Sequence, residues 1–160
     1  MTAPNTITAV PNTIQALVSI FQAAAPMDLN NRPIMVWYGR ELGVFAEPTT
    51  IEINGVSQTQ MPAELGPTYR REEEFIVHCK LTIFSGEGAD SVDHINRMVE
   101  AWNVWKLLEI AIANNPTLNG NVRFAEMSSV EDLPSSTPRG TAMHQLTFEI
   151  RAEQRVTSLS

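Results

Sequence analysis

The residue types that most often do chemistry are few and scattered in this chain. The three histidines are His78, His94 and His144, and none stands at metal-ligand spacing from another histidine or from the single cysteine, Cys79. A zinc site or a nucleophile–base motif places such residues at characteristic spacings, and no such motif is present. The sequence therefore predicts no catalytic residue, no metal site and no enzyme activity.

The one glycine-rich piece, Gly86-Glu87-Gly88, is the other place to look for a bound ligand. A phosphate-binding loop presents backbone N–H groups and a following lysine to its anion. Here the glutamate would repel phosphate, and no lysine follows. We interpret these residues as a turn between two elements, and we expect no cofactor.

A run of charges at residues 70–74, Arg70-Arg71-Glu72-Glu73-Glu74, has two interpretations. It is either the solvated start of a strand, whose opposite charges partly neutralise each other, or a contact or lumen surface of an oligomer. The chain of 160 residues carries a net charge of -7. Because DNA binding depends on lysine and arginine displacing counterions, we expect no specific binding of DNA.

Composition bounds the class and the compartment of the protein. One cysteine excludes an internal disulfide, and we expect Cys79 to be a buried thiol on the apolar side of a strand. Residues 1–10 lack a basic stretch followed by an apolar core, so we expect a flexible arm and no signal peptide. No stretch approaches the roughly 20 apolar residues that span a bilayer. We expect a single domain over residues 1–160, made in the cytosol and without a membrane contact.

Two strands form the centre of the expected fold. Apolar and polar residues alternate over Phe75–Ile83 and again over Leu146–Ala152, so we expect these segments to pair antiparallel. Their apolar side chains would then lie on one side of the sheet, which we call the dry face. Shorter strands are expected at Ile34–Tyr38, Thr49–Val56 and Val122–Met127, with a turn at Asn54-Gly55 and loops at residues 57–68 and 128–140. The surroundings of the first of these, residues 26–48, have no clear pattern.

Two helices are expected to cover the dry face. The first carries Ile14, Leu17 and Phe21 on one side, with a cap at Asn12 or Thr13 and a stop at Pro26. The second begins at Asp90 or Ser91 and ends at Asn114-Asn115-Pro116. The predicted class is α+β: a mainly antiparallel sheet of about four to five strands, with two helices packed on one face.

The second helix is apolar on more than one side around Trp102 and Trp105. Such a helix is either buried between the sheet and the first helix, the interpretation we favour, or partly buried against another subunit. Substituting Trp102 by alanine should cost on the order of 3–5 kcal/mol if that side chain is core.

The order of the expected elements and the pattern of residue types over residues 70–90 resemble a known family. Arg70-Arg71-Glu72-Glu73-Glu74-Phe75-Ile76-Val77 leads through a strand into Ser85-Gly86-Glu87-Gly88 and then into a helix that opens on Asp90. Over roughly residues 8–156, this arrangement is similar to the tail terminator proteins of long-tailed phages, most of all those of phages that infect actinobacteria. Residues 26–48 have no counterpart in the resemblance.

The resemblance implies a structural protein of the virion, in the neck region of the tail, that is present in the host cytoplasm during assembly. It implies a homo-oligomeric ring, a hexamer, that caps the completed tail tube, ends tail polymerisation and meets the head-completion proteins. DNA would pass through the lumen without specific binding. The family has no catalytic, cofactor-binding or metal-binding residues to transfer. A closed ring needs two different patches on each subunit, for which we expect the loop-rich strand ends and one sheet edge.

Other functions remain open from the sequence. One is another neck or tail component of a phage, such as a head-closure or tail-tube subunit. Another is a small intracellular ligand-binding α+β domain, in which the helices cover a pocket between themselves and the sheet.

Overall fold

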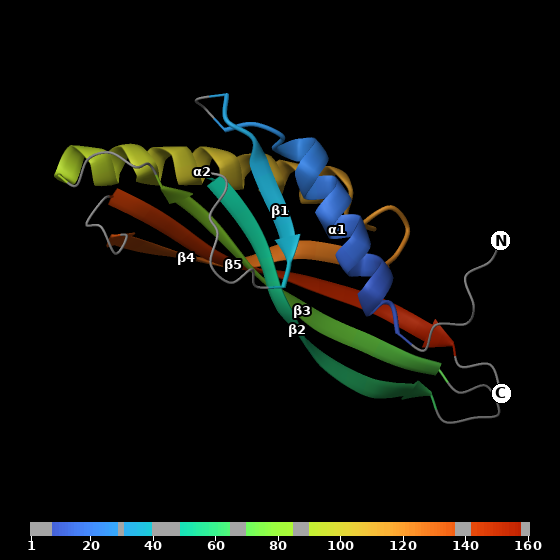
Figure 1. Cartoon of the computed structure of the whole chain (residues 1–160). Helices are drawn as coiled ribbons and strands as arrows, with labels where there is room; N and C mark the ends of the chain where they lie inside the picture. The colour runs from blue at the N-terminus through green and yellow to red at the C-terminus, as the bar shows by residue number, and fades with distance from the viewer. Residues whose placement is uncertain are drawn as a thin grey trace.

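The computed structural model describes residues 8–28, 31–39, 49–64, 70–84, 90–136 and 142–157. In chain order these residues form α1 (Val10–Ala24), β1 (Ile34–Tyr38), β2 (Thr49–Glu64), β3 (Arg70–Phe84), α2 (Ser91–Asn114), β4 (Phe124–Ser136) and β5 (Ala142–Thr157). Both helices lie on the same side of one twisted sheet (Figure 1). The predicted α+β class, with two helices on one face, is confirmed.

The sheet has the strand order β1-β2-β3-β5-β4. β1 runs parallel to β2, and every other neighbouring pair is antiparallel. β3 and β5 pair as the sequence predicted, with Phe75 opposite Ala152 and Leu81 opposite Leu146. The segment Ile34–Tyr38, expected as a short strand, is β1. The two edges of the sheet are therefore formed by unlike strands, β1 and β4.

Two strands continue through segments that were expected to be loops. β2 extends to Glu64, so the loop expected at residues 57–68 is wrong for residues 57–64. Asn54-Gly55 is not a hairpin turn but a register shift, where the pairing of Ile53 with Cys79 is followed by that of Gly55 with His78. An extra residue in one strand of an antiparallel pair makes a bulge and does not end the ladder.

β4 extends to Ser136, so the loop expected at residues 128–140 is wrong for residues 128–136. Its register shifts between Met127 and Ser129, and Pro134 lies opposite His144. β4 tolerates a proline because it is an edge strand, where a missing N–H faces away from the ladder. The expected turn at Gly86–Gly88 lies outside the described residues.

α1 begins without the side-chain cap that the sequence predicted. Its N-cap is Ala9, and Pro11 lies in the first turn, where its missing N–H costs nothing. Thr13 is inside the helix and donates its hydroxyl to the carbonyl oxygen of Ala9, over 2.8 Å. The caps expected at Asn12 or Thr13 are therefore wrong, whereas the end of the helix just before Pro26 is confirmed.

α2 begins and ends where the sequence predicted. The Asp90 carboxylate accepts from the backbone N–H of Asp93, and the Asp93 carboxylate accepts in return from the N–H of Asp90. This reciprocal pair satisfies two of the N–H groups that a helix start leaves unpaired. Since the charged form of Asp90 is the better acceptor, the bond from the Asp93 backbone N–H is the largest cause that lowers the pKa of the Asp90 carboxyl below its ordinary value.

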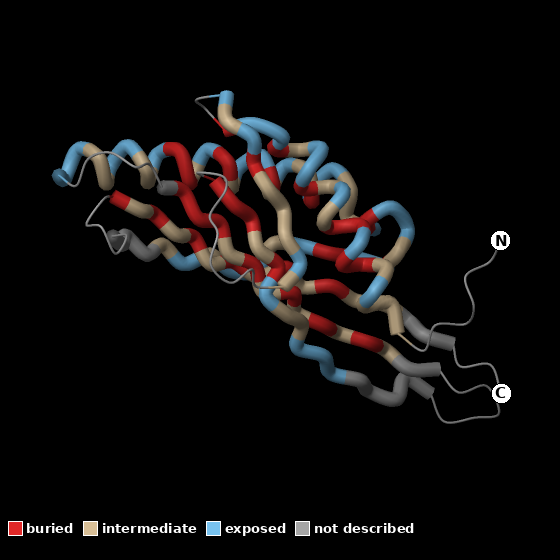
Figure 2. The backbone as a smooth tube through the Cα atoms, in the orientation of Figure 1, coloured by how far each residue is buried: buried red, intermediate tan, exposed pale blue. Residues whose placement is uncertain are grey.

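The core lies between the helices and the dry face of β3 and β5. The rings of Phe21 and Phe148 meet edge to face, with centroids 6.2 Å apart. Figure 2 shows buried and partly buried stretches alternating along the central strands. The wholly buried large side chains of this core are Phe21, Phe75, Phe148, Leu17, Ile34, Ile51, Ile53, Leu81, Ile83, Leu108, Ile112 and Leu118.

Candidate functional site

Glu73 behaves differently from the two glutamates beside it. It is 1% exposed, on the dry side of β3, and its Oε1 accepts from the Thr8 hydroxyl over 2.7 Å and from the Ala9 N–H over 3.1 Å. Both donors lie at the start of α1, where the helix dipole favours a negative charge. A carboxylate from the middle of the sheet thus caps a helix that has no cap of its own. Of the two interpretations of the charge run, the solvated start of a strand is wrong for Glu73.

A second polar cluster ties the chain before β1 to the sheet. Asp28 is buried, and its carboxylate accepts from the Arg32 Nε at 2.8 Å and the Arg32 backbone N–H at 3.0 Å. The hydroxyl of Thr49, at the start of β2, donates to the same carboxylate over 3.1 Å. These bonds fix the short excursion that contains Asp28 against the first residue of β2.

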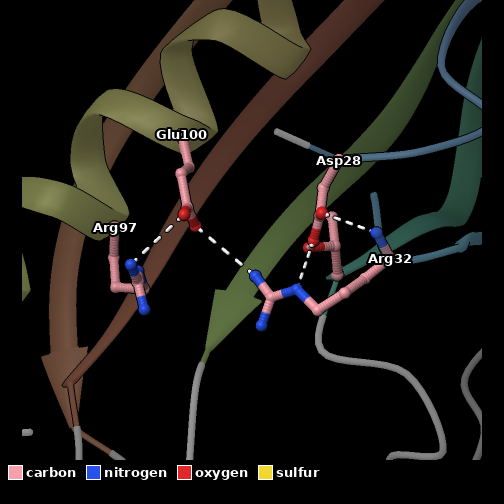
Figure 3. Close-up of polar contacts among 5 residues, drawn as sticks. Asp28, Arg32, Arg97 and Glu100 are labelled. Atoms are coloured by element: carbon pink, nitrogen blue, oxygen red, sulfur yellow. Dashed lines mark hydrogen bonds and ion pairs between the residues drawn. The ribbon is translucent and has the colours of Figure 1, made fainter. Parts of the chain in front are cut away.

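The cluster continues from Arg32 to α2, as Figure 3 shows. The Arg32 guanidinium lies between Asp28 and Glu100, with Nη2 3.7 Å from a Glu100 oxygen, and Arg97 donates to Glu100 over 3.2 Å. Glu100 is 7% exposed, so this pairing offsets the cost of burying its charge. Among the described residues of this cluster, two acids are paired with two bases, which suits a structural tie.

A third cluster joins α2 to the edge strand β4. The indole Nε1 of Trp102 donates to Asp132 Oδ2 over 2.7 Å, and Asp132 Oδ1 lies 2.5 Å from the Nε2 of His144. His144 is 2% exposed, and its Nδ1 has no hydrogen-bond partner in the described part of the chain. An aspartate–histidine pair activates a nucleophile in hydrolases. No described hydroxyl or thiol is hydrogen-bonded to this imidazole, and the Trp102–Asp132 bond joins α2 to β4.

The other two histidines lie apart from His144. His78 is on the solvent side of β3, 2.9 Å from the Ser57 hydroxyl and 3.4 Å from a Glu149 oxygen. His94 is in the first turn of α2. Among the described residues, no three histidine, cysteine or acidic side chains lie close enough together to hold a metal ion. Cys79 is 2% exposed, and desolvation raises the pKa of its thiol. Its predicted burial is confirmed.

The solvent face of the sheet carries ion pairs around Arg151. This guanidinium lies 2.7 Å from Glu153, 3.5 Å from Glu126 and 3.9 Å from Glu74. Arg123 adds contacts to Glu153 at 3.2 Å and to Glu72 at 4.0 Å. Because acids outnumber bases in this group, it offers no basic patch for a nucleic-acid backbone.

The outer face of α2 is apolar and open. Val92 is 63% exposed, Ile95 53%, Val99 46%, Leu107 44% and Ile110 46%. Their side chains lie opposite the buried face of Ala101, Val104, Leu108 and Ile112. The favoured interpretation, in which the sheet and α1 bury both sides of this helix, is therefore wrong for the outer side. We call these five residues the α2 stripe; the pale-blue stretches along α2 in Figure 2 include them.

Trp102 and Trp105 lie between the two sides of α2. Both are partly buried and pack against the core, with ring centroids 5.5 Å apart in an edge arrangement. Core packing of Trp102 is confirmed, although part of its surface stays exposed.

Sequence reasoning missed the residues that hold these clusters together. Glu73 lies in a charge run, and Asp28 and Arg32 lie in a segment without a clear pattern. The one available signal was the alternation of β3, which places Glu73 on the side of Phe75 and Val77.

No protein-family model matches this chain, and no curated protein matches it. In the described part of the chain, neither helix is long and apolar enough to cross a membrane. Among solved structures, the chain is similar to the type 4 fimbrial biogenesis protein PilO from Pseudomonas aeruginosa, with 9% sequence identity and a TM-score of 0.39, over 96% of this chain and 73% of that one. At that TM-score the similarity says nothing about function.

Proposed function

We propose that this protein is a structural subunit that assembles into a closed ring, and that the ring is the tail terminator of a long-tailed phage. The observation that carries the ring is the pair of unlike sheet edges. β1 forms one edge over five residues, beyond which β2 is itself the edge, and β4 forms the other edge with 13 residues. A contact between one edge of a subunit and the other edge of its neighbour is heterologous, and heterologous contacts that close by rotation generate rings.

The side chains at the two edges support such a contact. Tyr38, at the end of β1, is 65% exposed, and Phe124, at the start of β4, is 40% exposed. Aromatic residues are enriched where subunits meet. β4 also has a bulge and Pro134, which limit open-ended strand addition. A ladder with β1 cannot exceed its five residues, so these side chains would supply much of the contact.

The phage assignment rests on the resemblance of residues 8–156, and the ring on the edges. The structure supplies an α+β domain of the kind that the resemblance implies. Its acidic sheet face suits a surface that DNA passes without binding. The alternative of a ligand-binding domain needs a pocket under the helices, where the described part of the chain places wholly buried side chains such as Phe21, Phe148 and Leu108.

Native mass spectrometry and negative-stain electron microscopy of the purified chain test the proposal. We expect closed rings of a single copy number that remain finite as concentration rises. Cylinders of variable length would indicate a tube subunit, and a monomer at every concentration would refute the ring. Tyr38→Lys places a charge at the β1 edge and should reduce ring formation, whereas Gln15→Lys on the exposed side of α1 should not.

A further inference from the structure

When the exposed Asn103 is added to the α2 stripe, the spacing of the six positions reads the same in both directions along the helix. Val92, Ile95, Val99, Leu107 and Ile110 stand at symmetric distances from residue 101, with the exposed Asn103 in the place symmetric to Val99. Val92 and Ile110 are each nine residues from Ala101, about two and a half helical turns, so they point directly away from it. Ala101 is 0% exposed. The centre of the stripe therefore lies opposite the centre of the buried face.

A stripe of this kind is complementary to itself. When two copies of α2 pack antiparallel about a two-fold axis level with residue 101, Val92 of one copy is level with Ile110 of the other. Ile95 is then level with Leu107, and the two lie on opposite sides of the seam, where they can interdigitate. A two-fold contact uses the same patch on both partners, so a symmetric spacing favours a second copy over an unrelated protein.

The charges near the stripe are compatible with this pairing. Lys106 becomes level with the uncharged Asn96 of the other copy, and Lys106 is already paired with Glu109 at 2.6 Å. Asp93 and Glu109 would also be level with each other across the pair. Both lie about 100° around the helix from the centre of the stripe, on opposite flanks, and so outside the contact.

The size of the stripe sets the strength of the contact. Val92 and Ile110 are about 27 Å apart along the helix, and a helix face is about 10 Å wide. Each copy therefore covers roughly 270 Å², and the pair about 540 Å², which is less than the 1,200–2,000 Å² of a stable interface. A contact of that size gives reversible pairing that depends on concentration.

We infer that the α2 stripe is a two-fold docking surface for the α2 stripe of a second copy of this chain, with the helices antiparallel. This contact differs from the edge contacts of the proposed ring and does not depend on them, because it is isologous and uses another face of the molecule. A chain with both contacts would bring two subunits, or two rings, together through their helices.

Directional crosslinking of the full chain tests the geometry. One preparation carries Ile95→Cys and a second, isotopically labelled, carries Leu107→Cys; they are mixed and treated with a short thiol–thiol crosslinker. The antiparallel pair places residue 95 beside residue 107 of the other copy, while two copies of residue 95 stand about 18 Å apart. We expect the mixed 95–107 product to predominate. Predominant 95–95 and 107–107 products, equal amounts of all three, or no product above the wild-type mixture would each overturn the inference. Cys79 is too buried to contribute in that control.

A charged substitution tests the contribution of the stripe to association. Val99→Lys puts two like charges near the two-fold axis, where their repulsion and lost hydration should weaken dimerisation at least about 100-fold in analytical ultracentrifugation. Lysine is as good a helix former as valine, and Val99 is 46% exposed, so the melting temperature should change little. The matched control, Gln22→Lys on the exposed side of α1, should leave the dissociation constant unchanged. Equal effects of the two substitutions would refute the role of the stripe.

If Val99→Lys abolishes rings while the 95–107 crosslink is absent, the stripe serves the ring and the two-fold inference is wrong. If the crosslink forms but no ring is seen at any concentration, the ring is wrong and the two-fold contact stands.

Discussion

Three consecutive glutamates provide an internal test of how the start of α1 is held. Glu72, Glu73 and Glu74 share one residue type and one strand, but the side chains of Glu72 and Glu74 are 43% and 44% exposed, and Glu73 is 1% exposed. Substituting each by alanine compares a buried cap with two surface ion pairs at nearly constant position.

The structure sets the expected cost of Glu73→Ala. The substitution removes the acceptor of the Thr8 hydroxyl and of the Ala9 N–H, and hydrogen bonds to a charged group contribute about 1.5–3 kcal/mol each. The charge at the helix start adds about 0.3–1 kcal/mol. Desolvation of the carboxylate opposes these gains, and its Oε2 has no hydrogen-bond partner in the described residues. We expect a net loss of about 2–4 kcal/mol in the free energy of unfolding.

The neighbouring substitutions should cost far less. Glu72 lies 4.0 Å from Arg123, and Glu74 lies 3.9 Å from Arg151, which are long contacts between half-exposed groups. Each alanine variant should lose less than about 1 kcal/mol, as exposed ion pairs do. Glu73→Gln keeps one acceptor oxygen and loses the charge. Its loss of unfolding free energy should therefore lie between those of the surface variants and of Glu73→Ala, near about 1 kcal/mol.

Urea unfolding followed by far-UV circular dichroism measures these differences. Hydrogen exchange of the first turn of α1 provides a local readout, because loss of the cap should speed exchange there more than in α2. Equal losses at the three positions, or unchanged exchange in α1 after Glu73→Ala, would refute the capping role. A change in the m-value would show instead that the substitution altered the unfolded state or the two-state behaviour.

Three further predictions concern other buried or capping groups. Burial keeps the Cys79 thiol protonated in the folded chain, so only the unfolded chain releases its proton above about pH 8.5. The free energy of unfolding should therefore fall by up to about 1.4 kcal/mol per pH unit above that value. Cys79→Ala should remove this pH dependence from urea titrations at pH 8–10, and identical pH slopes for the variant and the wild-type chain would contradict the prediction. Trp102→Phe, which deletes the bond to Asp132, should cost about 1.5–3 kcal/mol, while in an Asp132→Ala background the same change should cost clearly less, as a double-mutant cycle measures. The lowered pKa of Asp90 means that its stabilisation is complete above the unfolded pKa near 3.9 and is lost as pH falls through the folded value. Asp90→Ala should thus lower the melting temperature at pH 7 more than at pH 2, with Asp90→Asn intermediate; an effect independent of pH would show that the charge contributes nothing.

The core of the fold could be predicted from the sequence because its patterns are periodic and continuous. The alternation around Cys79 and Phe148 determines which side of each strand is apolar. Because the two strands have apolar faces of similar length, they could be predicted to pair with each other, as they do. The capping pair at Asp90 marks the start of α2 equally clearly. These are local signals whose physical cause lies in adjacent residues.

The ends of the strands and the polar clusters could not be predicted, because their causes are distant in the chain. Polar residues 57–64 and 128–136 are strands because neighbouring strands pair with their backbones, and backbone pairing leaves no trace in side-chain polarity. Glu73 is buried because α1, more than sixty residues earlier, places two donors against it. Asp28 finds Thr49 in the same way. A sequence pattern reports on the faces of an element, whereas these contacts depend on how the elements are placed.

The two proposed contacts together determine the symmetry of the assembly. A heterologous contact between β1 and β4 repeats a rotation about one axis, and an isologous α2 contact adds two-fold axes, which lie perpendicular to it if two complete rings pair. The largest finite particle would then hold twice the copy number of one ring. Each α2 contact is small, but several formed at once between two rings would strengthen one another. Val99→Lys should accordingly convert double rings into single rings, and Tyr38→Lys should leave dimers. A single ring that is unaffected by Val99→Lys would mean that the stripe stays uncovered, or that it is covered only when a different protein docks on the ring.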